Sequence, residues 1–256
     1  MSDPYIIWAM RRTGGTTLAA LLSSLSEHPN VEHEPFNQGR VFGAVTAAWR
    51  EGRNRRRLRA DIAAALEKRP VIKHCYEIMP PELNRTLMEV ATELGYRHIV
   101  LDRRAESDRI LSLELARITG AWGGKDAKRI YGRIAAGEQE LAPVEVGSAV
   151  AHLHECRRHR EALERLLAAS RQTPFVVYFE DIYSDPAQGR QRVGRLLAFL
   201  GIDPAEHPDY EARLTDALLN RGQNSARILS SVPNISEART ALAEAAAKSP
   251  PLFEPS

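Results

Sequence analysis

The stretch from Met10 to Leu18, Met-Arg-Arg-Thr-Gly-Gly-Thr-Thr-Leu, constrains the fold more than any other part of the chain. The apolar run that precedes it, residues 5–9, has the length and composition of a buried strand. Leucines at positions 18, 21, 22 and 25 follow with helical spacing. The sequence therefore predicts a strand, a glycine turn and a helix. The glycines permit a sharp turn and leave no Cβ to obstruct a ligand.

A turn of this kind predicts an anion site. The first turn of the helix offers free N–H groups and the positive end of its dipole, and phosphate is the usual occupant. Guanidinium groups and hydroxyls around the glycines add donors that suit phosphate or sulfate oxygens. The residues that we expect to bind the anion are Arg11, Arg12, Thr13, Gly14, Gly15, Thr16 and Thr17. A tight turn with a polar rim is the alternative interpretation. The stretch lacks the Gly-Lys-Ser/Thr ending of a nucleoside-triphosphatase loop.

The rest of the chain alternates strand and helix patterns. Further strands are expected at 70–74, 97–101 and 174–179, with a short candidate at 31–34, and helices at 38–49, 81–94, 105–119, 148–170 and 186–200. This alternation predicts an α/β fold, with a parallel β-sheet flanked by helices on both faces. We expect one domain over residues 1–256, in which 123–147 forms a mobile excursion or short helices near the substrate entrance.

Composition narrows the function classes. The 35 basic and 33 acidic side chains leave a net charge of +2, which does not indicate nucleic acid. The two cysteines, Cys75 and Cys156, lie far apart, and this fits a reducing compartment better than a disulfide framework. There is no run of about 20 apolar residues, so no membrane span is expected. The N-terminus does not fit a signal peptide, so we expect a soluble cytoplasmic protein.

A second polar pair follows the predicted strand at 97–101. Ligands of open α/β sheets bind beyond the carboxyl ends of the strands, so residues at these positions are candidates. Arg104 follows the strand, and Ser112 comes eight residues later on the next helix, where both can face one pocket. Arg103 would make the spacing nine. The alternative is an arginine paired with a nearby carboxylate and a serine on a helix surface.

These motifs together resemble the sulfotransferases that use 3′-phosphoadenosine 5′-phosphosulfate (PAPS). Arg12 to Thr17 resembles their 5′-phosphosulfate loop, and the Arg104–Ser112 spacing resembles the pair that holds the 3′-phosphate. The wider stretch 101–122 looks like the bacterial carbohydrate-type enzymes, which include nodulation-factor and trehalose sulfotransferases. A third match covers 177–182, 185–186 and 196–202, where we expect Glu180 and Asp181 to anchor backbone rather than do chemistry.

One family feature is missing. Cytosolic sulfotransferases carry an Arg-Lys-Gly loop near the C-terminus, and this chain has none as such. The segment Arg221-Gly222-Gln223-Asn224 or the side chain of Arg227 could take its place over the nucleotide.

The resemblance implies an enzyme that transfers a sulfuryl group from PAPS to a hydroxyl of a carbohydrate or another small molecule by in-line displacement. Arg12 and the N–H groups of the loop would neutralise the leaving oxygen, and no metal is required. Glu34 is the preferred base, because related enzymes carry a Glu-Pro pair there and Pro35 favours an extended backbone at Glu34. His74 and His33 are the rival bases. An ion pair with an arginine such as Arg12 is the structural alternative for Glu34.

The chain offers other candidate functions and sites. A P-loop-type kinase or nucleoside triphosphatase would need the absent loop lysine and a magnesium-binding Asp, and a non-catalytic nucleotide sensor would lack a base. His152, Cys156 and His159 share a helix face that could bind zinc, although a solvated helix is the favoured interpretation. Trp49 and Trp122 suit either stacking on a sugar or packing. The arginines of 50–59 suit a solvated face or a surface that steers anions.

Overall fold

A computed structural model of the chain describes residues 2–31, 33–219, 225–248 and 250–256. It confirms an α/β protein in which helices flank one all-parallel sheet of four strands, in the order β2-β1-β3-β4, within these residues. The strands are β1 (Tyr5–Ala9), β2 (Ile72–Cys75), β3 (Arg97–Asp102) and β4 (Phe175–Tyr178). The ends of each strand lie within two residues of the ends of an expected strand.

The chain divides into two compact units, which are described separately below. The first unit contains residues 1–102, 162–220 and 253–256, and therefore the whole sheet. The second contains residues 103–161 and 221–252. The expectation of a single domain stays a prediction.

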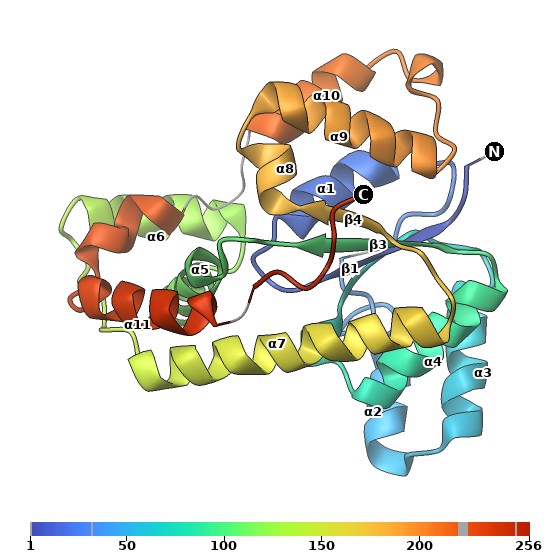
Figure 1. The fold of residues 1–256 in the computed structure, drawn as a ribbon, viewed down its shortest axis with the longest axis horizontal. Coiled ribbons are helices and arrows are strands. Elements are labelled where there is room, and N and C mark those ends of the chain that lie inside the picture. The colour runs from blue at the N-terminus through green and yellow to red at the C-terminus, as the bar shows by residue number, and fades with distance from the viewer. Residues whose placement is uncertain (1, 32, 220–224, 249) are drawn as a thin grey trace. The chain divides into compact units, whose positions relative to one another are not determined.

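Helices cover both faces of the sheet in the first unit. They are α1 (Gly15–Ser24), α2 (Gly43–Gly52), α3 (Arg55–Leu66), α4 (Pro81–Glu93), α8 (Phe179–Tyr183), α9 (Pro186–Phe199) and α10 (Tyr210–Leu219), with single 3-10 turns at Tyr76–Ile78 and Pro204–Glu206. In Figure 1, α1, α8, α9 and α10 lie on one face, while α4 lies on the other with α2 and α3 beside it.

Strand alternation explains the two layers. Residues with odd numbers, such as Ile7, Ile99 and Val177, join a buried apolar cluster with the leucines of α1 and α9. Residues with even numbers face the α4 side, where the buried Trp8 Nε1 donates to His98 Nδ1 at 3.0 Å. The polar atoms of this face are thus paired inside the core, as burial requires.

The order of the strands places the candidate site. β1 pairs in parallel with β2 on one side and with β3 on the other. The chain therefore reverses its direction across the sheet at β1, and the carboxyl end of β1 is a topological switch point, where open α/β sheets bind their ligands. The loop that begins at Met10 leaves the sheet at this point.

The second unit is helical. It contains α5 (Glu106–Thr119), α6 (Gly124–Ala135), the larger part of α7 (Val146–Ala169), the 3-10 segment η3 (Ser225–Ser231) and α11 (Ile235–Ala247). α6 packs against η3, and α11 packs against α5. The expected excursion at 123–147 thus contains a 12-residue helix, and its mobility stays a prediction.

Two expectations about the segment before α2 are wrong. Residues 31–34 form no strand among the described positions; Asn30 makes an isolated parallel bridge with Val71, and Glu34 has a left-handed backbone with φ 59°. The helix expected over 38–49 begins only at Gly43. Backbone bonds from Asn37 N to Glu34 O and from Phe42 N to Pro35 O hold the preceding residues in turns instead.

In the third sequence motif, Asp181 anchors backbone as expected, and the role of Glu180 stays a prediction. The Asp181 carboxylate accepts from Tyr178 N at 3.4 Å and lies 3.5 Å from Arg192 Nη2. Asp185 caps α9 by accepting from Ala187 N at 2.8 Å. These contacts fix the start of two helices after β4.

Candidate functional site

The loop between β1 and α1 is shaped by two left-handed residues. Arg12 has φ 70°, and Gly14, the N-cap of α1, has φ 78°. A Cβ at Gly14 would lie 2.8 Å from the rings of Phe179 and Tyr183, and the Tyr183 hydroxyl donates to Gly14 O at 3.2 Å. Glycine is therefore required at this position by the turn and by the packing of α8 against the loop. The space left by the missing Cβ is taken by protein side chains, not left for a ligand.

The N-terminus of α1 has the features of an anion site. Within the described chain, no side chain caps this helix and its first turn contains no acidic residue. Its N–H groups and positive dipole end are therefore available at the carboxyl end of β1. Thr16 is exposed and Thr17 is half-buried. The Thr13 hydroxyl instead donates to Met10 O at 2.8 Å and stabilises the loop from within.

Lys73 brings a cation to this helix end from the neighbouring strand. It pairs with Ile7 in the β1–β2 register, which places its side chain on the α1 face of the sheet. A Cβ at Gly15 would lie only 3.0 Å from Lys73 Cε, so the stem of the lysine fills the space that Gly15 leaves. The side chain is 6% exposed.

The Lys73 ammonium forms an ion pair with the Glu34 carboxylate. Glu34 Oε1 accepts from Lys73 Nζ at 2.6 Å and from Cys75 Sγ at 3.1 Å, while Oε2 accepts from Asn37 Nδ2 at 2.7 Å. Burial acts to raise the pKa of Glu34, but Lys73, together with Cys75 and Arg11, outweighs burial and holds that pKa below its ordinary value. Burial likewise opposes the charge of Lys73, and its neighbours Cys75 and Glu34 raise its pKa on balance.

The backbone at Glu34 differs from the expectation. Pro35 was expected to hold Glu34 in an extended conformation, but Glu34 is left-handed. Its N–H donates to Lys73 O at 3.0 Å and its carbonyl accepts from Asn37 N at 2.9 Å, so tertiary and turn hydrogen bonds outweigh the local preference. Glu34 forms an ion pair, as the structural alternative supposed, and its partner is Lys73. The Glu34 side chain remains 23% exposed, which leaves it accessible to a ligand.

Arg11 is held by a buried glutamate. Both Arg11 N and Arg11 Nε donate to Glu77 Oε1 at 2.8 Å, and the Glu77 side chain is 1% exposed. This pair orients the start of the loop. Arg12 is half-buried beside it. The anion-binding roles of both arginines, and the catalytic role of Arg12, stay predictions.

The rival base His74 faces away from this group. It follows Lys73 in β2, so its side chain points to the opposite face, where its ring contacts Trp8 and Phe36. Its Nε2 lies 2.7 Å from Asn84 Oδ1, and burial lowers its pKa to about 4. These contacts are those of a neutral core histidine. His33 lies in a bend rather than a strand, so alternation along a strand does not decide its direction.

The pair expected to hold a 3′-phosphate lies in the second unit. Arg104 is exposed before α5, and Ser112 is buried on α5, where its hydroxyl accepts from Ser225 Oγ at 3.0 Å. The alternative residue, Arg103, lies 3.9 Å from Asp108. Arg227 is exposed on η3, whereas Arg221 to Asn224 lie outside the described residues. The nucleotide roles of Arg104 and Ser112 stay predictions.

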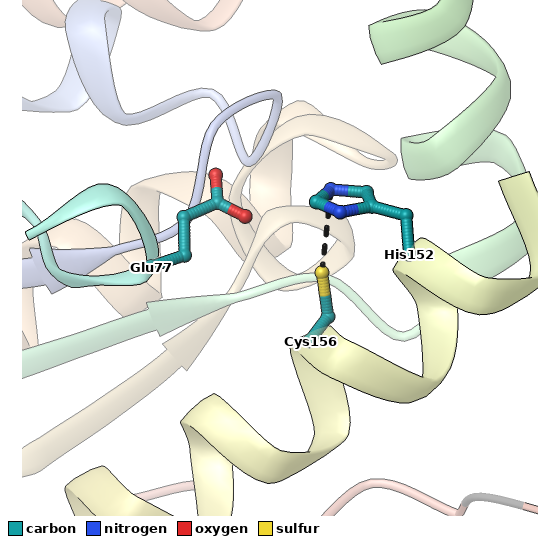
Figure 2. A group of neighbouring side chains, drawn as sticks. All are labelled: Glu77, His152 and Cys156. Atoms are coloured by element: carbon teal, nitrogen blue, oxygen red, sulfur yellow. Dashed lines mark hydrogen bonds between the residues drawn. The ribbon is translucent and has the colours of Figure 1, made fainter. Parts of the chain in front are cut away.

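The three zinc candidates of α7 do not come together as one group. His152 Nε2 lies 3.6 Å from Cys156 Sγ, and Figure 2 shows these side chains meeting across successive turns of the helix. Arg109 Nη2 also donates to Cys156 Sγ at 2.8 Å, and a guanidinium at this position opposes a cation. His159 turns instead to Glu155, at 3.6 Å.

The two tryptophans have different surroundings. Trp122, in the second unit, is 52% exposed, as a residue that stacks on a ligand would be. Trp49 is buried and packs inside the first unit. A role in binding an acceptor stays a prediction for Trp122 and is disfavoured for Trp49 by its burial.

Three contributors to this site were missed by reasoning from sequence. Lys73, Glu77 and the Phe179–Tyr183 pair all contact the loop or Glu34 from distant parts of the chain. One signal was present: Lys73 is a single cation inside an otherwise apolar strand pattern, and buried lysines need a partner. No protein-family model matches this chain, and no curated protein matches it.

Proposed function

We propose that this chain is a PAPS-dependent sulfotransferase, which transfers a sulfuryl group to a hydroxyl of a carbohydrate or another small molecule. The observation that carries the proposal is the arrangement at the carboxyl end of β1. An uncapped helix N-terminus and the Lys73–Glu34 ion pair lie there, and the stem of Lys73 packs beside Gly15, the first residue of that helix. The sequence resemblance of the loop to a 5′-phosphosulfate loop supports the same proposal.

Each of these groups suits a step of the transfer. The helix end and Lys73 would bind the sulfuryl oxygens and neutralise the charge that develops on the leaving phosphate oxygen, with Arg12 beside them. Glu34 would take the proton of the acceptor hydroxyl as its oxygen attacks sulfur in line with the leaving oxygen. The bond from sulfur to the donor phosphate then breaks, and adenosine 3′,5′-bisphosphate leaves.

The Lys73–Glu34 pair explains how a carboxylate with a low pKa could serve as the base. While Lys73 is bound to Glu34, the carboxylate is stabilised and is a weak base. A sulfuryl group at the helix end would compete with Glu34 for the Lys73 ammonium. As Lys73 turns to the sulfuryl group, the pKa of Glu34 would rise. The base would then become effective only when the donor is bound.

Phosphoryl transfer is the second candidate function, and one observation favours it. The loop has no lysine of its own, but Lys73 supplies one from β2. Asp102, buried at the end of β3, is the acidic residue that a magnesium ion would require. A kinase-like reaction of ATP would use the same helix end.

Calorimetric titration separates the two candidates. The purified protein is titrated with adenosine 3′,5′-bisphosphate and, separately, with ATP and Mg²⁺. Sulfuryl transfer predicts saturable binding of the bisphosphate and much weaker binding of ATP. The opposite preference would assign the site to phosphoryl transfer.

The role of Glu34 is tested by Glu34→Gln, which keeps the shape and removes the base. Transfer of ³⁵S from labelled PAPS to a panel of sugars and phenols is expected to fall by roughly 10²–10⁴, while bisphosphate affinity survives. Glu51→Gln, at an exposed position of α2, is the matched control. Normal transfer by Glu34→Gln would exclude Glu34 as the base.

A further inference from the structure

The connection between α2 and α3 carries the densest positive charge of the first unit. We define the arginine tip as the six arginines at its end: Arg50, Arg53, Arg55, Arg56, Arg57 and Arg59. All six are exposed. Figure 1 shows that the two helices join at the end of this hairpin that points away from the sheet.

Half of the arginine tip is paired within the protein. Arg55 Nε lies 2.9 Å from Glu82 Oε1, Arg57 Nε lies 3.5 Å from Asp61 Oδ2, and Arg59 bonds Glu93. In the part of the chain that the structure describes, Arg50, Arg53 and Arg56 have no carboxylate within ion-pair distance. Three guanidinium groups of the tip thus form no ion pair among the described residues, and that of Arg53 lies over the Trp49 ring.

The charge of Arg56 opposes the stability of α3, whereas Arg55 and Arg57 are paired with Glu82 and Asp61. The first turn of α3 contains Arg55, Arg56 and Arg57, and no acidic residue. The positive end of the helix dipole lies in this turn, where acidic side chains are stabilising and basic ones are not. Asn54 caps the helix by accepting from Arg57 N at 3.0 Å, so only the charges are unfavourable there. A choice of residues that costs folding stability is typical of a functional surface.

The shape and composition of the tip indicate the kind of partner. No large exposed hydrophobic side chain lies among the described residues 43–66, and Trp49 is buried under Arg53, whose guanidinium lies 5.6 Å from the Trp49 ring. A protein interface would need an apolar centre, and the tip has none. An extended nucleic-acid track would need a larger basic surface than one hairpin end on a chain with net charge +2.

We propose that the arginine tip is a docking surface for an anionic lipid bilayer. Headgroup phosphates and carboxylates move laterally, so they can match the spacing of the guanidinium groups of the tip without a groove or an apolar anchor. Binding by charge alone is reversible and falls with salt. This proposal does not depend on the reaction proposed for the β1–α1 loop.

The experiment is sedimentation of the full chain with vesicles. Neutral vesicles of phosphatidylcholine are compared with vesicles that contain phosphatidylserine, at low and at high salt. We expect binding to the anionic vesicles only, lost at high salt. At about 5-fold per arginine, the triple variant R50Q/R53Q/R56Q is expected to bind roughly 100-fold more weakly.

The matched control removes the same charge elsewhere. Arg171, Arg195 and Arg239 are also exposed, and Arg171 shares the left-handed backbone of Arg53. We expect R171Q/R195Q/R239Q to bind the vesicles less than 5-fold more weakly than the unaltered chain. Equal losses in the two triple variants, binding to neutral vesicles, or no vesicle binding would overturn the proposal. Tighter binding to a nucleic-acid duplex than to anionic vesicles at the same salt would overturn it as well.

A single substitution separates docking from folding. Arg56→Glu places an acidic residue in the first turn of α3, so the melting temperature is expected to stay the same or rise. Vesicle affinity is expected to fall by at least about 5-fold. If the triple variant fails to fold, this variant decides, and unchanged vesicle affinity in Arg56→Glu overturns the proposal.

Discussion

Glu34 in the first unit is half-buried and Glu106 in the second is buried, and basic side chains hold each of these carboxylates near a helix N-terminus. Of the two helices, only α1 has no acidic residue in its first turn. Glu106 is in the first turn of α5, where it accepts from Arg109 at 2.8 Å and pairs with Arg160. Its own charge therefore satisfies the helix dipole, and its side chain is 8% exposed. α1 contains no such acid, because Glu34 comes from a turn outside it.

The difference teaches how to separate a structural ion pair from a candidate site. Two guanidinium groups lower the pKa of Glu106 to about 2 against the opposing effect of burial, and they leave little for a ligand to do. Among the residues that the structure describes, Lys73 forms one ion pair, with the 23% exposed Glu34, and the stem of Lys73 lies against an uncapped helix end. An anionic ligand at the helix end would give the Lys73 ammonium a second negative partner, so the lysine need not be left unpaired when the ligand binds.

The largest expected effect is on the structural cluster. Arg109→Met leaves the Glu106 carboxylate with less than its full compensation in a buried position, so we expect a loss of about 3–5 kcal/mol in the free energy of unfolding, measured with urea. Arg117→Met is the matched control, because it removes a more exposed pair with Glu114 at the same spacing on α5. A loss of less than about 1 kcal/mol in Arg109→Met would contradict the distinction between the Glu106 cluster and the Lys73–Glu34 pair.

The next effect is on chemistry. Lys73→Met keeps the apolar stem beside Gly15 and removes the ammonium, so transfer from PAPS is expected to fall by about 10²–10³. The loss of unfolding free energy is expected to be smaller than in Arg109→Met, because Glu34 keeps two other donors and some exposure to water. Lys68→Met, at an exposed position, is the control. Full activity with a large loss of stability would place Lys73 with the structural cluster.

A third test asks whether the second unit also binds ligand. Arg104→Ala is expected to weaken adenosine 3′,5′-bisphosphate by about 1.5–3 kcal/mol relative to a nucleotide without the 3′-phosphate, as the loss of a charge-assisted contact predicts. Arg103→Ala is the discriminating variant, because its side chain lies near Asp108. Equal losses for both nucleotides, or a larger selective loss in Arg103→Ala, would contradict the assignment to Arg104.

Per pH unit, the smallest expected effect is the change in stability with pH, and this change separates the two units. Burial lowers the pKa of His74 and of His98 from 6.5 to about 4 in the folded first unit. The unfolded chain therefore binds more protons between these values, and stability falls as the pH drops from about 6.5 to 4, by at most about 1.4 kcal/mol per pH unit for each histidine.

Glu106 acts in a lower pH window. Its pKa is about 2 when folded and 4.5 ordinarily, so its contribution is complete above pH 4.5 and is lost as the pH falls toward 2.

Urea midpoints at pH 7, 5.5 and 4.5 test the histidine window, with His98→Gln expected to flatten the dependence of stability on pH. A constant midpoint from pH 7 to 4.5 would show that the buried histidines do not set the acid stability.

Local patterns were sufficient for most of the sheet. The apolar runs at 5–9, 70–74, 97–101 and 174–179 predicted four strands that the structure contains, and the glycine turn at Gly14 predicted the start of α1. The prediction of a strand at 31–34 was wrong, because turns and one hydrogen bond from Glu34 N to Lys73 O outweigh the strand-like composition of this segment. Such a bond depends on a residue 39 positions away, which no local pattern contains.

The amino-acid sequence by itself therefore determined the α/β class, the parallel sheet implied by alternating strands and helices, and the position of the glycine turn after β1. Periodicity and glycine positions act over a few residues, and the sequence displays them directly. Only the tertiary structure decided that Lys73, Glu34 and Cys75 meet at that turn, that Glu77 holds Arg11, and that His74 belongs to the core. These contacts arise from strand register and chain return over tens of residues, where the burial of one charge requires a partner that the packing of the whole sheet selects.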